Sequence, residues 1–114
     1  FMASPMACAA GCASLELFKE YDWEGRVKNI ERQLKHELQE LTELPNVAEI
    51  RVLGAVGVAA LRKVPSPETV QKIVRETGVW LRPFGSWLYT MPPFITPEEE
   101  ISRIVGAMRK IAEA

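Results

Sequence analysis

The sequence predicts an α+β domain of two layers, in which helices cover a small and mostly antiparallel sheet. Three observations support this fold class. The chain has 114 residues, the length of one domain with a modest core. The hydrophobic period changes between a helical and a strand pattern, and glycines and prolines separate the segments. The predicted order is two helices, two strands, a helix, two strands and a helix.

The first predicted helix covers the opening of the chain, FMASPMACAAGCASLELF, which has no charged side chain before Glu16. A helix that is apolar on all sides needs a covering layer. Cys8 and Cys12 share one face of it, and we expect two small buried thiols rather than a disulfide. A metal pair is the alternative, but zinc needs about four ligands and His36 is the only histidine.

Residues 23–43 predict a long amphipathic helix that ends before Pro45. Its apolar side chains recur at spacings of three and four: Val27, Ile30, Leu34, Leu38 and Leu41. Alternating apolar and charged residues over 48–52 then predict a half-buried strand. The run 56–61 is apolar on both faces, which is typical of a central strand.

Two further helices have clear start signals. Ser66-Pro67-Glu68 combines an N-cap residue, a first-turn proline and a first-turn acid, and the helix should end at Gly78. The last helix should begin at Thr96-Pro97-Glu98-Glu99, where Thr96 and Glu99 can form a capping box. Between these helices, short strands are expected at 79–82 and 87–91, joined across Pro83-Phe84-Gly85-Ser86.

Composition argues against several classes of partner. The formal net charge is −1, with 47% apolar and 25% charged residues, so the chain lacks the basic excess that nucleic acid or anionic membranes attract. No run approaches the ~18 apolar residues of a membrane span, and no basic region precedes the first segment. We therefore expect a cytoplasmic location.

The usual catalytic patterns are weak in this chain. GAVG at 54–57 lacks the spacing of a dinucleotide-binding loop. The acidic run at 98–100 is better explained as the first turn of a helix, where carboxylates favour the positive end of the dipole. His36 lies between Lys35 and Glu37 on a solvated helix, without the cleft and positioned partner that a general base needs.

Arg82 is the strongest candidate, because it lies within the apolar and aromatic stretch GVWLRPFGSWLYTMPP. On a strand it would share a face with Trp80. One interpretation is an edge-strand arginine in a salt bridge, with the aromatic residues in the core. The other is an anion anchor, since a guanidinium can hold a carboxylate bidentately beside apolar walls. The aromatic neighbours are Trp80, Phe84, Trp87 and Tyr89.

Three blocks, FMASPMACAAGCASLELF, IRVLGAVGVAAL and GVWLRPFGSWLYTMPPFI, together resemble the class III pyridoxal-phosphate aminotransferases. The resemblance implies the type I aminotransferase fold and a homodimer. Residues 1–20 would be the end of the large, cofactor-binding domain, and residues 21–114 the C-terminal small domain. Within the family, the blocks are most similar to the member of biotin biosynthesis that transfers the amino group of S-adenosylmethionine to 8-amino-7-oxononanoate.

The resemblance also implies roles for single residues. Arg82 would bind the carboxylate of the keto substrate, Tyr89 would approach the substrate, and Phe84 and Gly85 would lie near its acyl chain. The family's cofactor lysine and its pyridoxal-phosphate-binding residues lie upstream of Phe1, so we expect no catalytic or cofactor-binding residue here and no activity of this chain alone. The alternatives are another class III omega-aminotransferase, or a non-catalytic α+β module that binds a ligand or a partner.

Overall fold

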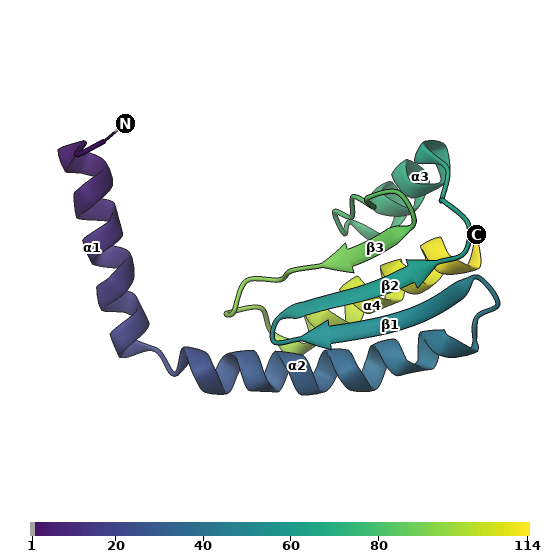
Figure 1. The fold of residues 1–114 in the computed structure, drawn as a ribbon, viewed down its shortest axis with the longest axis horizontal. Helices are drawn as coiled ribbons and strands as arrows, with labels where there is room; N and C mark the ends of the chain where they lie inside the picture. Colours follow the sequence, from purple (N-terminus) through teal and green to yellow (C-terminus); the bar gives the residue numbers. More distant parts are fainter. Residues whose placement is uncertain (1) are drawn as a thin grey trace.

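The computed structural model describes residues 2–114 and contains one antiparallel sheet flanked by helices (Figure 1). The strands β1 (Val47–Leu53), β2 (Val56–Leu61) and β3 (Trp87–Thr90) are adjacent in the order β1-β2-β3. The remaining elements are α1 (Pro5–Glu20), α2 (Trp23–Gln39), the 3-10 helix η1 (Glu40–Glu43), α3 (Pro67–Thr77) and α4 (Glu98–Glu113). The predicted α+β class is confirmed.

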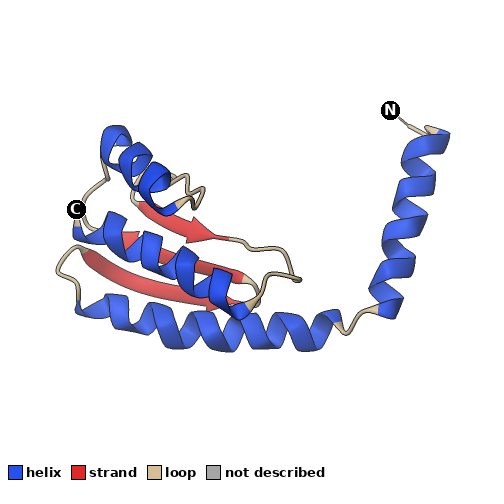
Figure 2. Ribbon diagram, turned by 180° about the vertical axis from the view of Figure 1, so that it is seen from behind, coloured by secondary structure: helices blue, strands red, loops and turns tan. Residues whose placement is uncertain are grey.

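The core lies between one face of the sheet and the helices α2 and α4; in Figure 2, α4 lies in front of the strands and α2 runs along their lower edge. The helical period of α2 places Leu34 and Leu38 on the sheet side, and both are fully buried. Met108 and Ile111 of α4 meet the same core, and Leu88 contributes from β3. Within residues 2–114, no helix packs on the other face of the sheet.

Helix α3 has the ends that its sequence predicts. The Ser66 hydroxyl accepts a hydrogen bond from the backbone N–H of Thr69 at 3.2 Å. Gly78 ends the helix with φ of +68°, a left-handed conformation that favours glycine, and its N–H donates to the Val74 carbonyl. Local signals alone were sufficient for this element.

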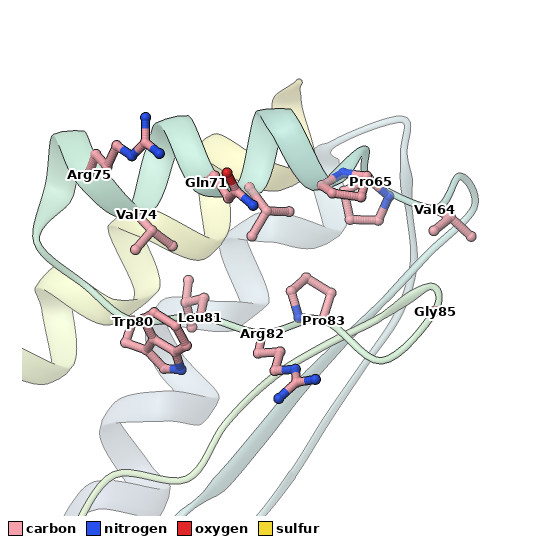
Figure 3. A pocket seen from close by; sticks show the side chains of 12 residues that line it. Val64, Pro65, Gln71, Val74, Arg75, Trp80, Leu81, Arg82, Pro83 and Gly85 are labelled. Atoms are coloured by element: carbon pink, nitrogen blue, oxygen red, sulfur yellow. The ribbon is translucent and has the colours of Figure 1, made fainter.

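The strand predicted at 79–82 is wrong, because no ladder forms there. The segment meets β3 only through an isolated bridge between Phe84 and Trp87. Leu81 is 6% exposed and points toward α3 (Figure 3), so its burial under the helix draws the segment away from the sheet edge. The burial of the Leu81 side chain is therefore more favourable than further backbone pairing of this segment with β3.

The capping box at the start of α4 is also wrong. The N-cap is Pro97, in an extended conformation, and no side chain caps the helix. Thr96 therefore lies one residue too early to face the first turn, and its N–H donates instead to the Pro93 carbonyl at 3.0 Å.

Helix α1 extends away from the rest of the chain (Figure 1), and none of its residues is buried. Cys8 and Cys12 are consequently exposed free thiols, which corrects the prediction that they are buried. Among residues 2–114, no layer covers this helix. No helix among residues 2–114 combines the length and hydropathy that crossing a membrane requires.

Candidate functional site

The candidate site is built on a tight turn that joins the segment containing Arg82 to β3. Phe84 and Trp87 exchange both backbone hydrogen bonds, at 2.9 and 3.0 Å, across Gly85 and Ser86. Gly85 has φ of +59°, where glycine is favoured, and no atom lies within 4 Å of a Cβ placed on it. This turn fixes the backbone two residues after Arg82.

Side chains around this turn alternate between two faces. Leu81 and Leu88 point into the core and are 6% and 0% exposed. Arg82, Phe84 and Trp87 are exposed on the opposite side, as is Tyr89. An antiparallel turn places residues that face each other across it on the same side, so Phe84 and Trp87 share one surface, which continues to Tyr89 along β3.

The interpretation of Arg82 as a salt-bridged arginine beside core aromatics does not agree with this arrangement. Within residues 2–114, the Arg82 guanidinium has no salt bridge or hydrogen bond. Trp80 and Phe84 are 81% and 78% exposed rather than buried. The guanidinium is therefore available to an anionic group from outside this chain.

We name the uncovered side of the sheet the outer face, defined by Glu49, Arg51, Val58, Trp87 and Tyr89. The register places Arg51, Val58 and Tyr89 in one cross-strand row, and Glu49, Ala60 and Trp87 in the next. The Arg51 guanidinium lies 4.7 Å from the centre of the Trp87 ring, and its Nε is 2.9 Å from Glu49 Oε1. The alternation of apolar and charged residues in β1 predicts that Glu49 and Arg51 lie on the exposed face. It does not predict that Arg51 contacts Trp87, because this contact depends on the order of the strands in the sheet.

A groove of about 900 Å³ lies between α3 and the segment 80–85. Figure 3 shows Leu81, Pro83 and Val74 facing each other across it, whereas the Arg82 guanidinium points away from α3. The groove is therefore mainly apolar, and the charge of Arg82 lies on its other side. Arg75 and Gln71 lie along the helical rim.

Several charged side chains outside this surface form ion pairs within one helix. On α2, the Lys35 ammonium bonded to Glu31 at 2.7 Å lowers the pKa of that carboxyl, although partial desolvation opposes the effect. Among residues 2–114, no three side chains of His, Cys, Asp or Glu gather where they could hold a metal ion, so the metal alternative for Cys8 and Cys12 gains no support.

The lysines of this chain do not fit the role of a pyridoxal-phosphate carrier. Such a lysine needs a sheltered position beside the cofactor. Every lysine here is exposed, and Lys35 and Lys72 face carboxylates one turn along their own helices. None of the lysines among residues 2–114 therefore has the sheltered position that this role requires.

The fold and this surface together define a class of protein. An amine transaminase from an uncultivated Pseudomonas species, solved with pyridoxal phosphate bound, superposes with a TM-score of 0.81 at 28% identity, covering 95% of this chain and 27% of that chain. The ornithine aminotransferase of Toxoplasma gondii gives a TM-score of 0.79 at 22% identity, covering 96% and 27%. The arrangement of helices and strands is thus that of one part of a transaminase.

The family profile described as "Aminotransferase class-III" matches residues 1–112, and this chain belongs to that family. It is similar to the adenosylmethionine-8-amino-7-oxononanoate aminotransferases of Corynebacterium glutamicum (44% identical, 95% of this chain, 26% of the relative) and Mycobacterium leprae (39%, 98% and 26%). It is also similar to an omega-aminotransferase of Caulobacter vibrioides (31%, 97% and 26%). The chain spans about a quarter of the length of these relatives.

Proposed function

We propose that this chain is the substrate-binding C-terminal part of a pyridoxal-phosphate-dependent aminotransferase that moves the amino group of S-adenosylmethionine to 8-amino-7-oxononanoate. The family and the names of the relatives support the reaction. Residues 1–20 are proposed to complete the large domain and residues 21–114 to form the small domain. A homodimer and a cytoplasmic location remain predictions of the same proposal.

The unpartnered guanidinium of Arg82 carries this proposal. An arginine keeps its charge at any physiological pH and offers a planar fork of donors that matches a carboxylate. Phe84, two residues after Arg82, and Tyr89 on β3 are exposed as well, and we propose that they contact an alkyl chain that extends from that carboxylate. Gly85 keeps the approach open, because nothing occupies the space where its side chain would be.

The division of work follows from what the chain contains. Its own residues bind and orient the substrate carboxylate, and its aromatic side chains shield that ion pair from water when the rest of the enzyme closes over them. Pyridoxal phosphate supplies the amino-group chemistry when bound, and it must be held by residues outside positions 2–114. The isolated chain is therefore expected not to transaminate.

Arg82→Ala in the full-length aminotransferase containing this chain tests the proposal. A lost charged hydrogen-bond pair costs roughly 1.5–3 kcal/mol, so apparent affinity for the keto substrate should fall by about one to two powers of ten. Arg82→Lys should not restore it, because an ammonium lacks the fork geometry. Single-turnover measurements of the two half-reactions give the result, and the half-reaction with the amino donor should change less.

Arg109→Ala is the matched control. This arginine on α4 pairs with Glu40 at 3.0 Å and lies away from the outer face, so its loss should leave substrate affinity unchanged. An unchanged affinity in Arg82→Ala would contradict the proposal that Arg82 binds the substrate carboxylate.

The similarity to an omega-aminotransferase keeps that reaction class as a second candidate, and faster turnover of a short omega-amino acid than of S-adenosylmethionine would favour it.

A further inference from the structure

The pairing of Arg51 with Trp87 has no explanation in the function proposed so far. The two side chains come from opposite edge strands, β1 and β3, with β2 between them. Between them stands Ala60, paired with Trp87 on one side and with Glu49 on the other. Its small side chain leaves the space through which Arg51 reaches diagonally across β2 to the indole.

Glu49 determines how the guanidinium lies. It is two residues from Arg51 on the same strand, so both side chains project from the outer face. The 2.9 Å contact between Arg51 Nε and Glu49 Oε1 holds the guanidinium on the row that contains Trp87. The charge of Arg51 is thus already compensated, which makes this arginine a poor second anchor for a substrate anion and distinguishes it from Arg82.

Trp87 connects this pair to the candidate site. Its backbone exchanges two hydrogen bonds with that of Phe84 across the turn, and Arg82 lies two residues before Phe84 in the chain. Tyr89 follows Trp87 by two residues on the same face of β3. The indole therefore lies next to Tyr89 on one face of β3 and opposite Phe84 across the turn that follows Arg82. It is 39% exposed and has no aromatic partner among residues 2–114. The Arg51 guanidinium lies over this ring, 4.7 Å from its centre.

We propose that Arg51, held by Glu49, is a positioning residue that keeps the Trp87 indole as an apolar wall beside Arg82 and Tyr89. The wall contacts the alkyl chain of a substrate whose carboxylate is bound by Arg82, and this inference rests on that proposed function. A cation over the face of an indole is attracted by the negative ring face, and the contact fixes the ring plane as well as its position. Arg51 acts through Trp87 and does not touch the substrate.

The test uses Arg51→Gln, Arg51→Lys and Trp87→Leu in the full-length aminotransferase. Arg51→Gln should raise KM for the keto substrate about two- to fivefold, the range that an exposed cation–π contact supports, while kcat changes little. Arg51→Lys should recover part of the loss, because an ammonium keeps the charge over the ring. Trp87→Leu should raise KM similarly, and combining it with Arg51→Gln should add nothing further, since both changes remove the same wall.

Arg109→Gln provides the control, because it also removes a partly exposed, carboxylate-paired arginine, but from α4. It should leave KM unchanged. If Arg82→Ala raises KM and Arg51→Gln does not, the positioning role is wrong while the proposed function stands. If Arg51→Gln and Trp87→Leu raise KM additively, the two residues act separately and the inference also fails. If Arg82→Ala leaves KM unchanged, the proposed function itself is wrong.

Discussion

At the scale of single residues, Gly57 lies where β2 packs closely against α2. A Cβ placed on Gly57 would lie 2.7 Å from Leu38 Cδ1 and 3.5 Å from Leu34 Cδ1. Both leucines are 0% exposed, so their side chains have little space to move. Gly57→Ala should therefore lower the free energy of unfolding by about 1–3 kcal/mol, measured by urea denaturation.

Gly106 on α4 is the matched control for that change. It is exposed, and no atom outside its own helix lies within 4 Å of an added Cβ. Gly106→Ala should raise the free energy of unfolding by up to about 1 kcal/mol, because alanine loses less backbone entropy in a helix. Equal effects of the two substitutions would show that the contact between β2 and α2 is looser than described.

The surroundings of Arg82 could be predicted from the sequence only in part. The sequence predicts that Arg82 stands among aromatic residues, and it leaves open whether these form a core or a surface. Burial decides that question, because Leu81 and Leu88 fill the core and leave Phe84 outside. Arg51 could not be connected with Trp87 at all, since the two are 36 positions apart and meet only through strand order.

At the scale of elements, the sequence predicts best those helices and strands whose ends are determined by residues close in the chain. Helix α3 was predicted with both ends, because Ser66 and Gly78 act on their own backbone. The strand at 79–82 was not, because a strand needs a partner and Leu81 is instead drawn under α3. Helix α1 was predicted as a helix, yet whether a layer covers it depends on parts of a protein that a local pattern does not describe.

Helix α1 should contribute little to the stability of the remaining chain. Its junction with α2 shows an edge-to-face contact of Phe18 with Trp23 at 6.0 Å and the Arg26 guanidinium 5.6 Å from the Tyr21 ring. Removing residues 1–21, while keeping the Asp22 N-cap of α2, should lower the free energy of unfolding by less than about 2 kcal/mol. Urea denaturation followed by circular dichroism at 222 nm measures this.

The contrasting deletion removes residues 108–114, which takes Met108 and Ile111 out of the core. That chain should lose cooperative unfolding, because two fully buried side chains leave a cavity between α4 and the sheet. A comparable loss on removing residues 1–21 would contradict the view that α1 is independent of the core.

At the scale of the whole molecule, two surfaces with exposed apolar side chains lack a partner among residues 2–114. One is the outer face of the sheet, and the other is helix α1 with its exposed Met6, Leu15 and Phe18. They differ in charge: the outer face carries Arg51 and Glu49, whereas the first ten positions of α1 contain no charged residue. Covering the outer face therefore costs desolvation of ions, and covering α1 does not.

This difference predicts how the chain behaves in solution. We expect weak, concentration-dependent self-association through α1, because large exposed apolar side chains favour a covering surface. A helix of 16 residues is only about 24 Å long, so the area that two copies can bury is smaller than in a standard stable interface.

Sedimentation velocity over a range of concentrations should show a reversible shift to larger species for the whole chain. The chain without residues 1–21 should remain a monomer, and Leu15→Lys with Phe18→Lys should weaken association, whereas the same charge added at exposed His36 on α2 should not. A whole chain that stays monomeric with α1 folded back and buried against its own sheet would contradict this prediction, because it would mean that the covering layer of α1 is already present within these 114 residues.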